Sequence, residues 1–143
     1  SLISGRNPDF LIEHQVNAVP LLKKTKLEVI ATGYILIDGG NETAVAKVSQ
    51  TKPLDVRNSD YIAQTAQAGE LLGNKLIYLE AGSGALNPIS SEIIQKVSHS
   101  IQIPLLVGGG ISHQKEIQEA FDSGATMVVI GTAFENNLNF FNE

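Results

Sequence analysis

The triplet Tyr78-Leu79-Glu80 contains the side chains best suited to chemistry in this sequence. Side chains alternate along a strand, so Tyr78 and Glu80 share one face while Leu79 points to the other. A carboxylate at the end of an otherwise apolar strand is costly to bury unless it has a partner or a task. An isolated glutamate at a strand end is usually solvated, but beside a phosphate site we interpret Glu80 as catalytic.

Three predicted strands end in glycine-bearing turns, and these turns indicate such a phosphate site. They are Gly82-Ser83-Gly84, Gly108-Gly109-Gly110 and Gly131-Thr132. Glycine lets the backbone approach a phosphate closely, and amide N–H groups near a helix N-terminus supply donors. The alternative explanation is that these glycines only allow tight turns of the backbone. Because two of the turns follow the last two strands, where α/β barrels bind phosphate, we favour the phosphate interpretation.

Other polar residues carry weaker signals. Asp38, in Asp-Gly-Gly, could belong to an acidic metal loop, but Asp-Gly is first a turn signal. His14, His99 and His113 lack metal-ligand spacing, and we expect them at the surface. Ser83 lies in Gly-Ser-Gly rather than G-x-S-x-G, and no histidine is placed to activate it, which excludes a serine hydrolase.

Hydrophobic periodicity and turn residues predict alternating strands and helices. Gly33 suggests a bulge or bend in the first strand, Pro20 should interrupt or end the first helix, and Ser112 should cap a later one. The polar stretch 38–58 is either a working loop or holds short structure of its own. Strands are expected over 27–37, 75–80, 104–107 and 127–130, and helices over 7–22, 60–73, from about 90, over 112–124 and from 136 to 143.

The later strands are near-continuous apolar runs, which is typical of a parallel sheet buried on both faces. Their spacing leaves room for one right-handed crossover helix each time. We therefore expect an α/β fold.

Composition narrows the classes of function. Hydrophobic residues make up 43% of the 143, enough for a core, and the net charge is −5. No basic cluster longer than Lys23-Lys24 appears, which argues against nucleic acid as the main partner. The sequence has no cysteine, which excludes disulfides and thiolate sites, and no run of 18 apolar residues that could span a membrane. We expect a cytoplasmic protein and, because the sequence opens at Ser1 on an apolar stretch, a piece of a longer chain.

Several motifs together resemble the geranylgeranylglyceryl phosphate synthases and their bacterial heptaprenyl relatives. YLEAGSG is the specific signal, whereas VGGGI and GT are shared with other phosphate-binding barrels. The resemblance covers essentially the whole chain and implies a (β/α)8 TIM barrel, with 1–143 as the C-terminal part of one domain and roughly its last four βα units. The matching segments are 1–8, 31–40, 78–85, 107–111 and 131–135.

The resemblance implies a prenyltransferase that joins the C3 hydroxyl of sn-glycerol 1-phosphate to a prenyl diphosphate, geranylgeranyl or longer, and releases diphosphate. Glu80 would be the general base and Tyr78 would position the hydroxyl, while Tyr34 would line the prenyl groove. The implied glycerol-phosphate-binding residues are Tyr78, Leu79, Glu80, Ala81, Gly82, Ser83, Gly84, Gly108, Gly109, Gly110, Gly131 and Thr132.

The family also uses Mg²⁺, whose ligands belong to the first half of the barrel; that half is absent from this sequence, so no metal ligand is expected here. A homo-oligomer, dimer or hexamer, and transient contact with a membrane surface are implied as well. Two alternatives stay open. One is another phosphate-binding TIM-barrel enzyme, an isomerase or synthase acting on a sugar phosphate. The other is a non-catalytic module that binds glycerol phosphate.

Overall fold

A four-stranded parallel sheet forms the centre of the computed structural model, which describes residues 1–141. The strands lie in chain order, β1-β2-β3-β4, so each pairs with the next along the sequence. All pairs are parallel, as the apolar runs predicted. The strands are β1 (Thr32–Leu36), β2 (Leu76–Glu80), β3 (Leu105–Gly108) and β4 (Met127–Val129).

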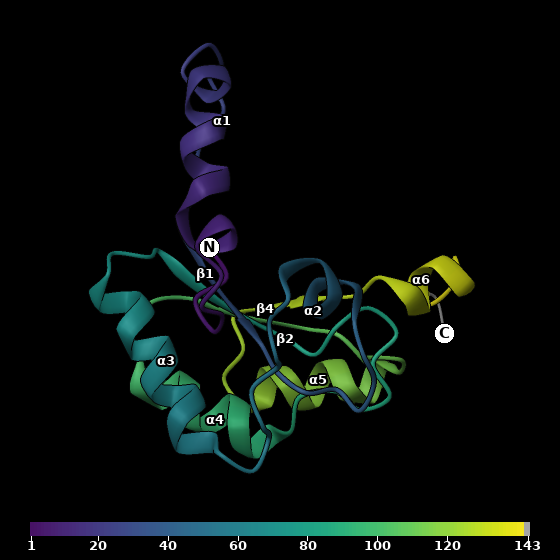
Figure 1. The fold of residues 1–143 in the computed structure, drawn as a ribbon. Coiled ribbons are helices and arrows are strands. Elements are labelled where there is room, and N and C mark those ends of the chain that lie inside the picture. Colours follow the sequence, from purple (N-terminus) through teal and green to yellow (C-terminus); the bar gives the residue numbers. More distant parts are fainter. Residues whose placement is uncertain (142–143) are drawn as a thin grey trace.

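Helices cover one face of this sheet. Figure 1 shows α3, α4 and α5 side by side below the strands, while α2 and α6 lie near the ends where the strands stop. The buried core lies between the sheet and these three helices and includes Ile35, Ile62, Leu79, Val97 and Val107. None of the helices in residues 1–141 combines the length and the apolarity needed to cross a bilayer. The helices are α1 (His14–Leu22), α2 (Ala44–Ser49), α3 (Ser59–Leu71), α4 (Ser91–Ser100), α5 (Gln114–Asp122) and α6 (Thr132–Asn136), with a π-helical segment at Asp9–Glu13.

Side-chain caps fix where several helices begin. The Asn58 side chain accepts from the backbone N–H of Tyr61 at 3.2 Å, and α3 starts at the next residue. Ser90 caps α4 in the same way, and α4 begins near residue 90 as the sequence predicted. Before α5 the cap differs from the prediction. His113 occupies the N-cap position, and Glu116 accepts from the backbone N–H groups of both Ser112 and His113.

The first helical segment stands away from the sheet as an arm, seen at the top of Figure 1. Asn7 caps it by accepting from the N–H of Asp9 at 3.1 Å. The expected break at Pro20 is wrong in position, since α1 continues through Pro20 and ends at Leu22. Proline lacks its own N–H and its ring crowds the carbonyl four residues earlier, so α1 gives up one intrahelical hydrogen bond at Pro20 without ending there.

The predicted first strand is shorter than expected. Residues 27–31 are exposed and only Thr32–Leu36 forms β1, because a strand needs a paired neighbour and β2 begins opposite Thr32. The bulge expected at Gly33 is also wrong, since the register runs evenly past it. Glycine is required there by close packing: a Cβ would lie 2.8 Å from Ile3 Cδ1 and 2.9 Å from Ile77 Cδ1.

The stretch 38–58 contains short structure of its own, one of the two predicted outcomes. Helix α2 lies within it and is capped by Thr43, whose side chain accepts from the N–H of Ala46 at 3.1 Å.

The helix expected from Asn136 is wrong in position. Helix α6 ends at Asn136, and the last two residues of that prediction, 142 and 143, lie outside the described residues.

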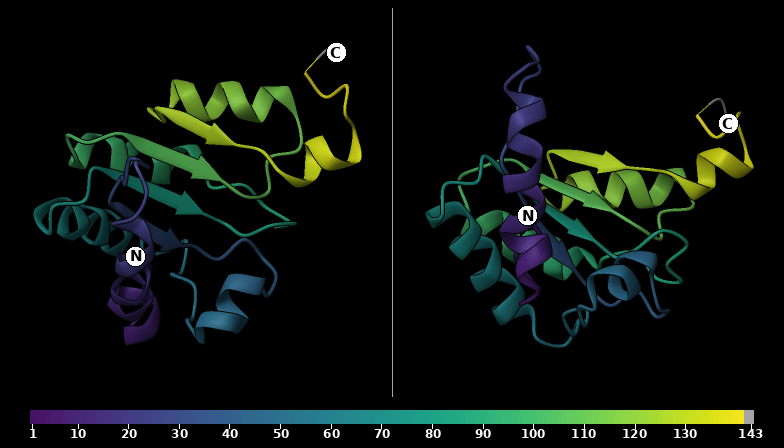
Figure 2. Two further views of the ribbon diagram at one scale, coloured as in Figure 1. Left: turned by 90° about the horizontal axis from the view of Figure 1, so that it is seen from above. Right: turned by 45° about the horizontal axis from the view of Figure 1, so that its top comes forward.

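The register brings the polar residues of the sheet together on the face that the helices leave open. Tyr34 of β1 lies directly opposite Tyr78 of β2, and Glu80 lies opposite Gly108 of β3. Figure 2 shows the strands running in one direction, so their carboxyl ends meet at one edge. On this open face Val129 of β4 keeps 41% of its surface exposed.

Candidate active site

Glu80 is a buried carboxylate at the carboxyl end of β2, with 8% of its surface exposed. Its Oε1 accepts from the backbone N–H of Gly82 at 2.7 Å, and its Oε2 accepts from the hydroxyl of Tyr78. Two donors therefore fix the orientation of the carboxylate and offset part of the cost of burying it. A base held in this way is pre-oriented for proton transfer.

Gly108, the last residue of β3, and Gly109, which follows it, make room for Glu80 and Tyr78. A Cβ at Gly108 would lie 2.6 Å from the Tyr78 hydroxyl and 2.9 Å from Glu80 Oε2. At Gly109, where φ is +86°, a Cβ would lie 2.6 Å from both Glu80 Oε1 and the Gly82 nitrogen. Both contacts are closer than real carbon atoms tolerate. These glycines thus serve the packing of the carboxylate, a role that the sequence reasoning did not foresee.

Two tyrosines extend the site across the open face of the sheet. The ring of Tyr34 meets the ring of Tyr78 edge-on, with centroids 5.1 Å apart. Burial raises the pKa of both phenols well above the usual range, and the neighbouring Glu80 charge adds to the effect. For Tyr78 the hydrogen bond to Glu80 raises the pKa further. Both phenols therefore stay protonated, and Tyr78 remains a donor.

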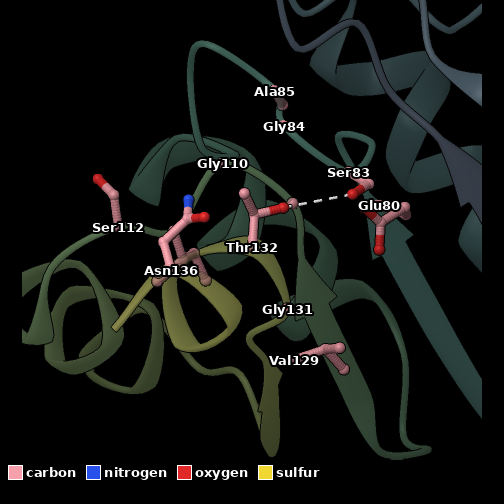
Figure 3. A pocket seen from close by; sticks show the side chains of 13 residues that line it. Glu80, Ser83, Gly84, Ala85, Gly110, Ser112, Val129, Gly131, Thr132 and Asn136 are labelled. Carbon is pink, nitrogen blue, oxygen red and sulfur yellow. Dashed lines mark hydrogen bonds between the residues drawn. The ribbon is translucent and has the colours of Figure 1, made fainter. Parts of the chain in front are cut away.

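A cavity of about 260 Å³ opens beside Glu80, between the turn after β2 and the start of α6. Figure 3 shows the hydroxyls of Ser83 and Thr132 turned towards each other at its wall, with Glu80 beside Ser83. The two hydroxyl oxygens are 3.3 Å apart, within hydrogen-bond distance. Hydroxyl and backbone groups can hydrogen-bond a small anionic ligand, while the carboxylate would reach only one end of it. The cavity has the size and lining of a site for a small phosphate ester.

The structure brings most of the predicted ligand-binding residues to this cavity. It is lined by seven of them: Glu80, Ser83, Gly84, Gly109, Gly110, Gly131 and Thr132. Tyr78 and Gly108 instead contact Glu80 from the side, as described above. Gly82 donates its N–H to that carboxylate, whereas Leu79 and Ala81 point into the core and offer no side chain to a ligand.

Further residues complete the lining. Ser112 follows the turn after β3, and Asn136 lies one helical turn beyond Thr132, on the same side of α6. The spacing from Thr132 to Asn136 could have indicated the second, because residues four apart on a helix share a face. The others carry no distinctive signal in the sequence. They are Ala85, Ile111, Val129 and Ala133.

A second, more open cavity of about 500 Å³ lies between β1, α2 and the first helical segment. Tyr34 forms part of its wall, and the ring of Phe10 lies edge-on to His14 at its rim, with centroids 4.8 Å apart. The lining is mostly apolar and suits a hydrocarbon chain. The remaining lining residues are Ser1, Leu2, Gln15, Ala44, Val45 and Val48.

The residues described here do not form a metal site. Across 1–141 no three His, Asp or Glu side chains lie close enough together to hold an ion. Asp38 accepts from the N–H of Gly40 at 2.9 Å, which is a turn, as Asp-Gly indicated. His14, His99 and His113 are exposed, as expected. Glu80 and Tyr78 remain the hydrogen-bonded titratable pair beside the polar cavity.

Sequence comparison confirms the resemblance expected from the motifs. The profile of the PcrB family matches residues 1–142. A curated geranylgeranylglyceryl phosphate synthase of Flavobacterium johnsoniae is 62% identical over 141 residues, covering 99% of this chain and 58% of that protein. One of Pyrococcus furiosus is 39% identical over 136 residues, covering 95% of this chain and 53% of that protein. The chain thus spans somewhat more than half the length of these relatives.

Solved structures agree. The chain superposes with a TM-score of 0.92 and 29% identity on (S)-3-O-geranylgeranylglyceryl phosphate synthase from Thermoplasma acidophilum, solved in complex with sn-glycerol 1-phosphate. The alignment covers 99% of this chain and 57% of that one. The corresponding enzyme of Thermoplasma volcanium gives 0.90 and 32%, with 99% and 56% covered. These likenesses confirm the TIM-barrel type of α/β fold, and the chain belongs to the PcrB family.

Proposed function

We propose that the protein carrying this sequence is a prenyltransferase that joins the C3 hydroxyl of sn-glycerol 1-phosphate to a prenyl diphosphate. The observation that carries the proposal is Glu80, a buried carboxylate held by two donors at the mouth of a polar cavity. The family supports it, because its curated members named above are geranylgeranylglyceryl phosphate synthases. An isolated phosphate-binding module would have no need of this buried acid.

In the proposed reaction Glu80 takes the proton from the C3 hydroxyl. The oxygen of that hydroxyl forms a bond to the first carbon of the prenyl chain, while the bond from that carbon to diphosphate breaks. A carboxylate is a weak base towards an alcohol, so proton transfer comes late, after most of the bond to diphosphate has broken. Tyr78 keeps the carboxylate turned towards the cavity by donating its hydroxyl proton to Oε2.

The phosphate of the substrate would lie in the 260 Å³ cavity against Ser83 and Thr132, with Glu80 at one side of it. Ser83 and Thr132 offer hydroxyl donors there, and Gly110 and Gly131 leave the backbone exposed to the ligand. Phosphate oxygens accept strongly from such donors without a lysine. This placement leaves the glycerol end of the substrate near Glu80.

The prenyl chain would occupy the second cavity, whose lining is mostly apolar. Tyr34 lines this cavity and contacts Tyr78, which donates to Glu80 beside the polar cavity, so a ligand with a polar head and an apolar tail would pass the tyrosine pair. Tyr34 is thus proposed to line the prenyl groove close to the reacting carbon.

Three finer points belong to the same proposal. Magnesium, which the resemblance implies, would supply positive charge to the departing diphosphate, and we propose that residues outside this sequence bind it. Assembly as a homo-oligomer is proposed from the resemblance. A cytoplasmic location fits a chain without cysteine.

The test is transfer of radiolabelled glycerol 1-phosphate to a series of prenyl diphosphates by the full-length protein with Mg²⁺. The Glu80→Gln variant keeps the shape of the side chain and loses its basicity, so turnover should fall at least about 100-fold. Binding of glycerol 1-phosphate, measured by calorimetry, should stay within about threefold of the unsubstituted protein. Undiminished turnover by this variant would refute the role of Glu80.

The same experiment separates the alternatives. Binding of glycerol 1-phosphate without transfer to any prenyl diphosphate would indicate a non-catalytic binding module. Conversion of a sugar phosphate in place of prenyl transfer would indicate an isomerase or synthase of the barrel class.

A further inference from the structure

Two loops meet at the carboxyl ends of β1 and β2. We call residues 38–43, which follow β1 and lead into α2, the strap. The other loop is the turn at 81–87, after β2. The Gly39 carbonyl of the strap accepts from the backbone N–H of Leu86 at 2.9 Å and from that of Asn87 at 3.1 Å. The strap therefore holds the end of the turn that leads away from the sheet.

The strap and the start of the turn are packed against each other without free space. A Cβ on Gly82 would overlap Thr43 Cγ2, and a Cβ on Gly39 would lie 2.5 Å from the Ala81 carbonyl oxygen. Both contacts exclude any residue larger than glycine. The turn after β2 thus takes its position from the strap as well as from its own strand.

One side-chain hydrogen bond joins the strap to the part of the turn that lines the polar cavity. The side-chain amide of Asn41 donates to the Gly84 carbonyl at 3.0 Å. Gly84 and its neighbour Ser83 both line the 260 Å³ cavity, and Figure 3 shows the Ser83 hydroxyl turned towards Thr132. Asn41 does not line this cavity itself, so any influence on a ligand there must pass through the turn.

This part of the turn has little else to restrain it. Glycine flanks Ser83 on both sides, with φ at +103° for Gly82 and +69° for Gly84, and glycine has more backbone freedom than any other residue. A Cβ on Gly84 would meet nothing within 4 Å, so close packing does not hold that residue as it holds Gly82. The hydrogen bond from Asn41 supplies a restraint at this point.

We propose that Asn41 is a positioning residue for the substrate phosphate, because its amide fixes Gly84 and thereby holds the Ser83 hydroxyl where the phosphate binds. The inference rests on the proposed function, which places the phosphate against Ser83 and Thr132. Without this bond the turn would adopt more conformations, and the ligand would have to restrict them on binding. Loss of the Asn41 amide should therefore weaken substrate binding.

Turnover at saturating substrate should change little. Glu80 takes its two hydrogen bonds from Gly82 and Tyr78, and neither bond involves Asn41. Since the carboxylate keeps its orientation, kcat should stay within about twofold when Asn41 is replaced. A residue that only supported the overall fold would not divide its effect in this way.

The test compares Asn41→Ala with Asn74→Ala in the full-length protein. Asn74 is a matched control, because its side-chain amide also donates to a glycine carbonyl at 3.0 Å, that of Gly69, and it does not line the polar cavity. Asn41→Ala should raise the Kd for glycerol 1-phosphate, measured by calorimetry, about 3- to 10-fold, the range expected for one hydrogen bond. Asn74→Ala should leave that Kd within about twofold.

A second comparison uses Ser83→Ala as the background. If Asn41 acts by holding the Ser83 hydroxyl, adding Asn41→Ala to this variant should raise the Kd by no more than about twofold. The same factor with and without Ser83 would overturn the proposal. So would an unchanged Kd in Asn41→Ala, or equal weakening by Asn41→Ala and Asn74→Ala. Absence of prenyl transfer by the unsubstituted protein would refute the proposed function alone, because the ratios of Kd do not depend on transfer.

Discussion

Replacing Gly109 by alanine tests whether the packing around Glu80 determines both stability and activity. The new Cβ would lie 2.6 Å from Glu80 Oε1 and 2.6 Å from the Gly82 nitrogen, which donates to that same oxygen. The residue also has φ at +86°, a conformation that L side chains rarely adopt. The substitution therefore strains the backbone and pushes the carboxylate away from its donor.

The two costs can be estimated separately. Placing an L residue in the left-handed region costs about 1–2 kcal/mol, and inserting a methyl group into filled space costs about 1–3 kcal/mol. The free energy of unfolding should fall by about 2–5 kcal/mol. For a protein of this class, that corresponds to a fall in Tm of roughly 4–20 °C. Turnover should fall as well, because Glu80 can no longer keep both of its hydrogen bonds.

Gly131→Ala is the matched control for this measurement. Gly131 also lines the cavity, but a Cβ there meets nothing within 4 Å and its φ is −115°. Its stability should change by no more than about 0.5 kcal/mol. Scanning fluorimetry of the two full-length variants gives the comparison, and the prenyl transfer assay gives activity. Equal melting temperatures for Gly109→Ala and Gly131→Ala would refute the packing argument.

Four further outcomes are expected. Thr132→Val removes a hydroxyl from the cavity and should weaken glycerol 1-phosphate binding about 10-fold or more by calorimetry, whereas an unchanged Kd would exclude that contact. Asn58→Ala removes the cap of α3 and should lower the free energy of unfolding, measured by urea denaturation, by about 1 kcal/mol. An unchanged free energy would show that the cap does not stabilise the helix. The raised pKa of Tyr78 means that the folded state holds the phenol proton more tightly than the unfolded state, so this contribution to stability is fully present below about pH 10 and is lost as the pH rises beyond that. Tyr78→Phe should therefore flatten the fall in unfolding free energy above about pH 10. The same fall in both proteins would contradict this. The hydrogen bond from Arg57 lowers the pKa of Asp55 to about 2, and Arg57→Ala should let it return towards its usual range in an NMR titration, where a static value would show another cause.

The sequence predicts the sheet well because its signals are local. The apolar runs ending at Glu80 and Val107 carry enough information to place two strands within about a residue, and alternation alone puts Tyr78 and Glu80 on one face. The same applies to Asp38, whose turn follows from the residues beside it. These features depend on neighbours in the chain, which a single sequence displays.

Features that depend on distant neighbours were predicted poorly. Residues 27–31 have strand composition but lack a strand opposite them, and composition cannot show that. The reason for Gly33 lies in Ile3 and Ile77, which only the folded chain brings near it. At the site, the glycines after β3 were assigned to phosphate alone, although Gly109 also makes room for Glu80. The role of a glycine such as Gly109 depends on contacts between strands, and a local sequence pattern does not show these contacts.

The order of the strands has a consequence for how the chain acquires its structure. Among the four strands in residues 1–141 each pairs with its successor, so no pairing between them has to wait for a segment from the far end of the sequence. The spans to be closed also shorten along the chain: the loop joining Thr32 to Leu76 is roughly twice as long as the one joining Leu106 to Met127. A twofold difference in loop length corresponds to about 0.6 kcal/mol of closure entropy, which favours early pairing of β3 with β4. Folding can thus proceed from the C-terminal strands back towards β1, with Glu80 fixed in place only when β2 joins strands that have already paired.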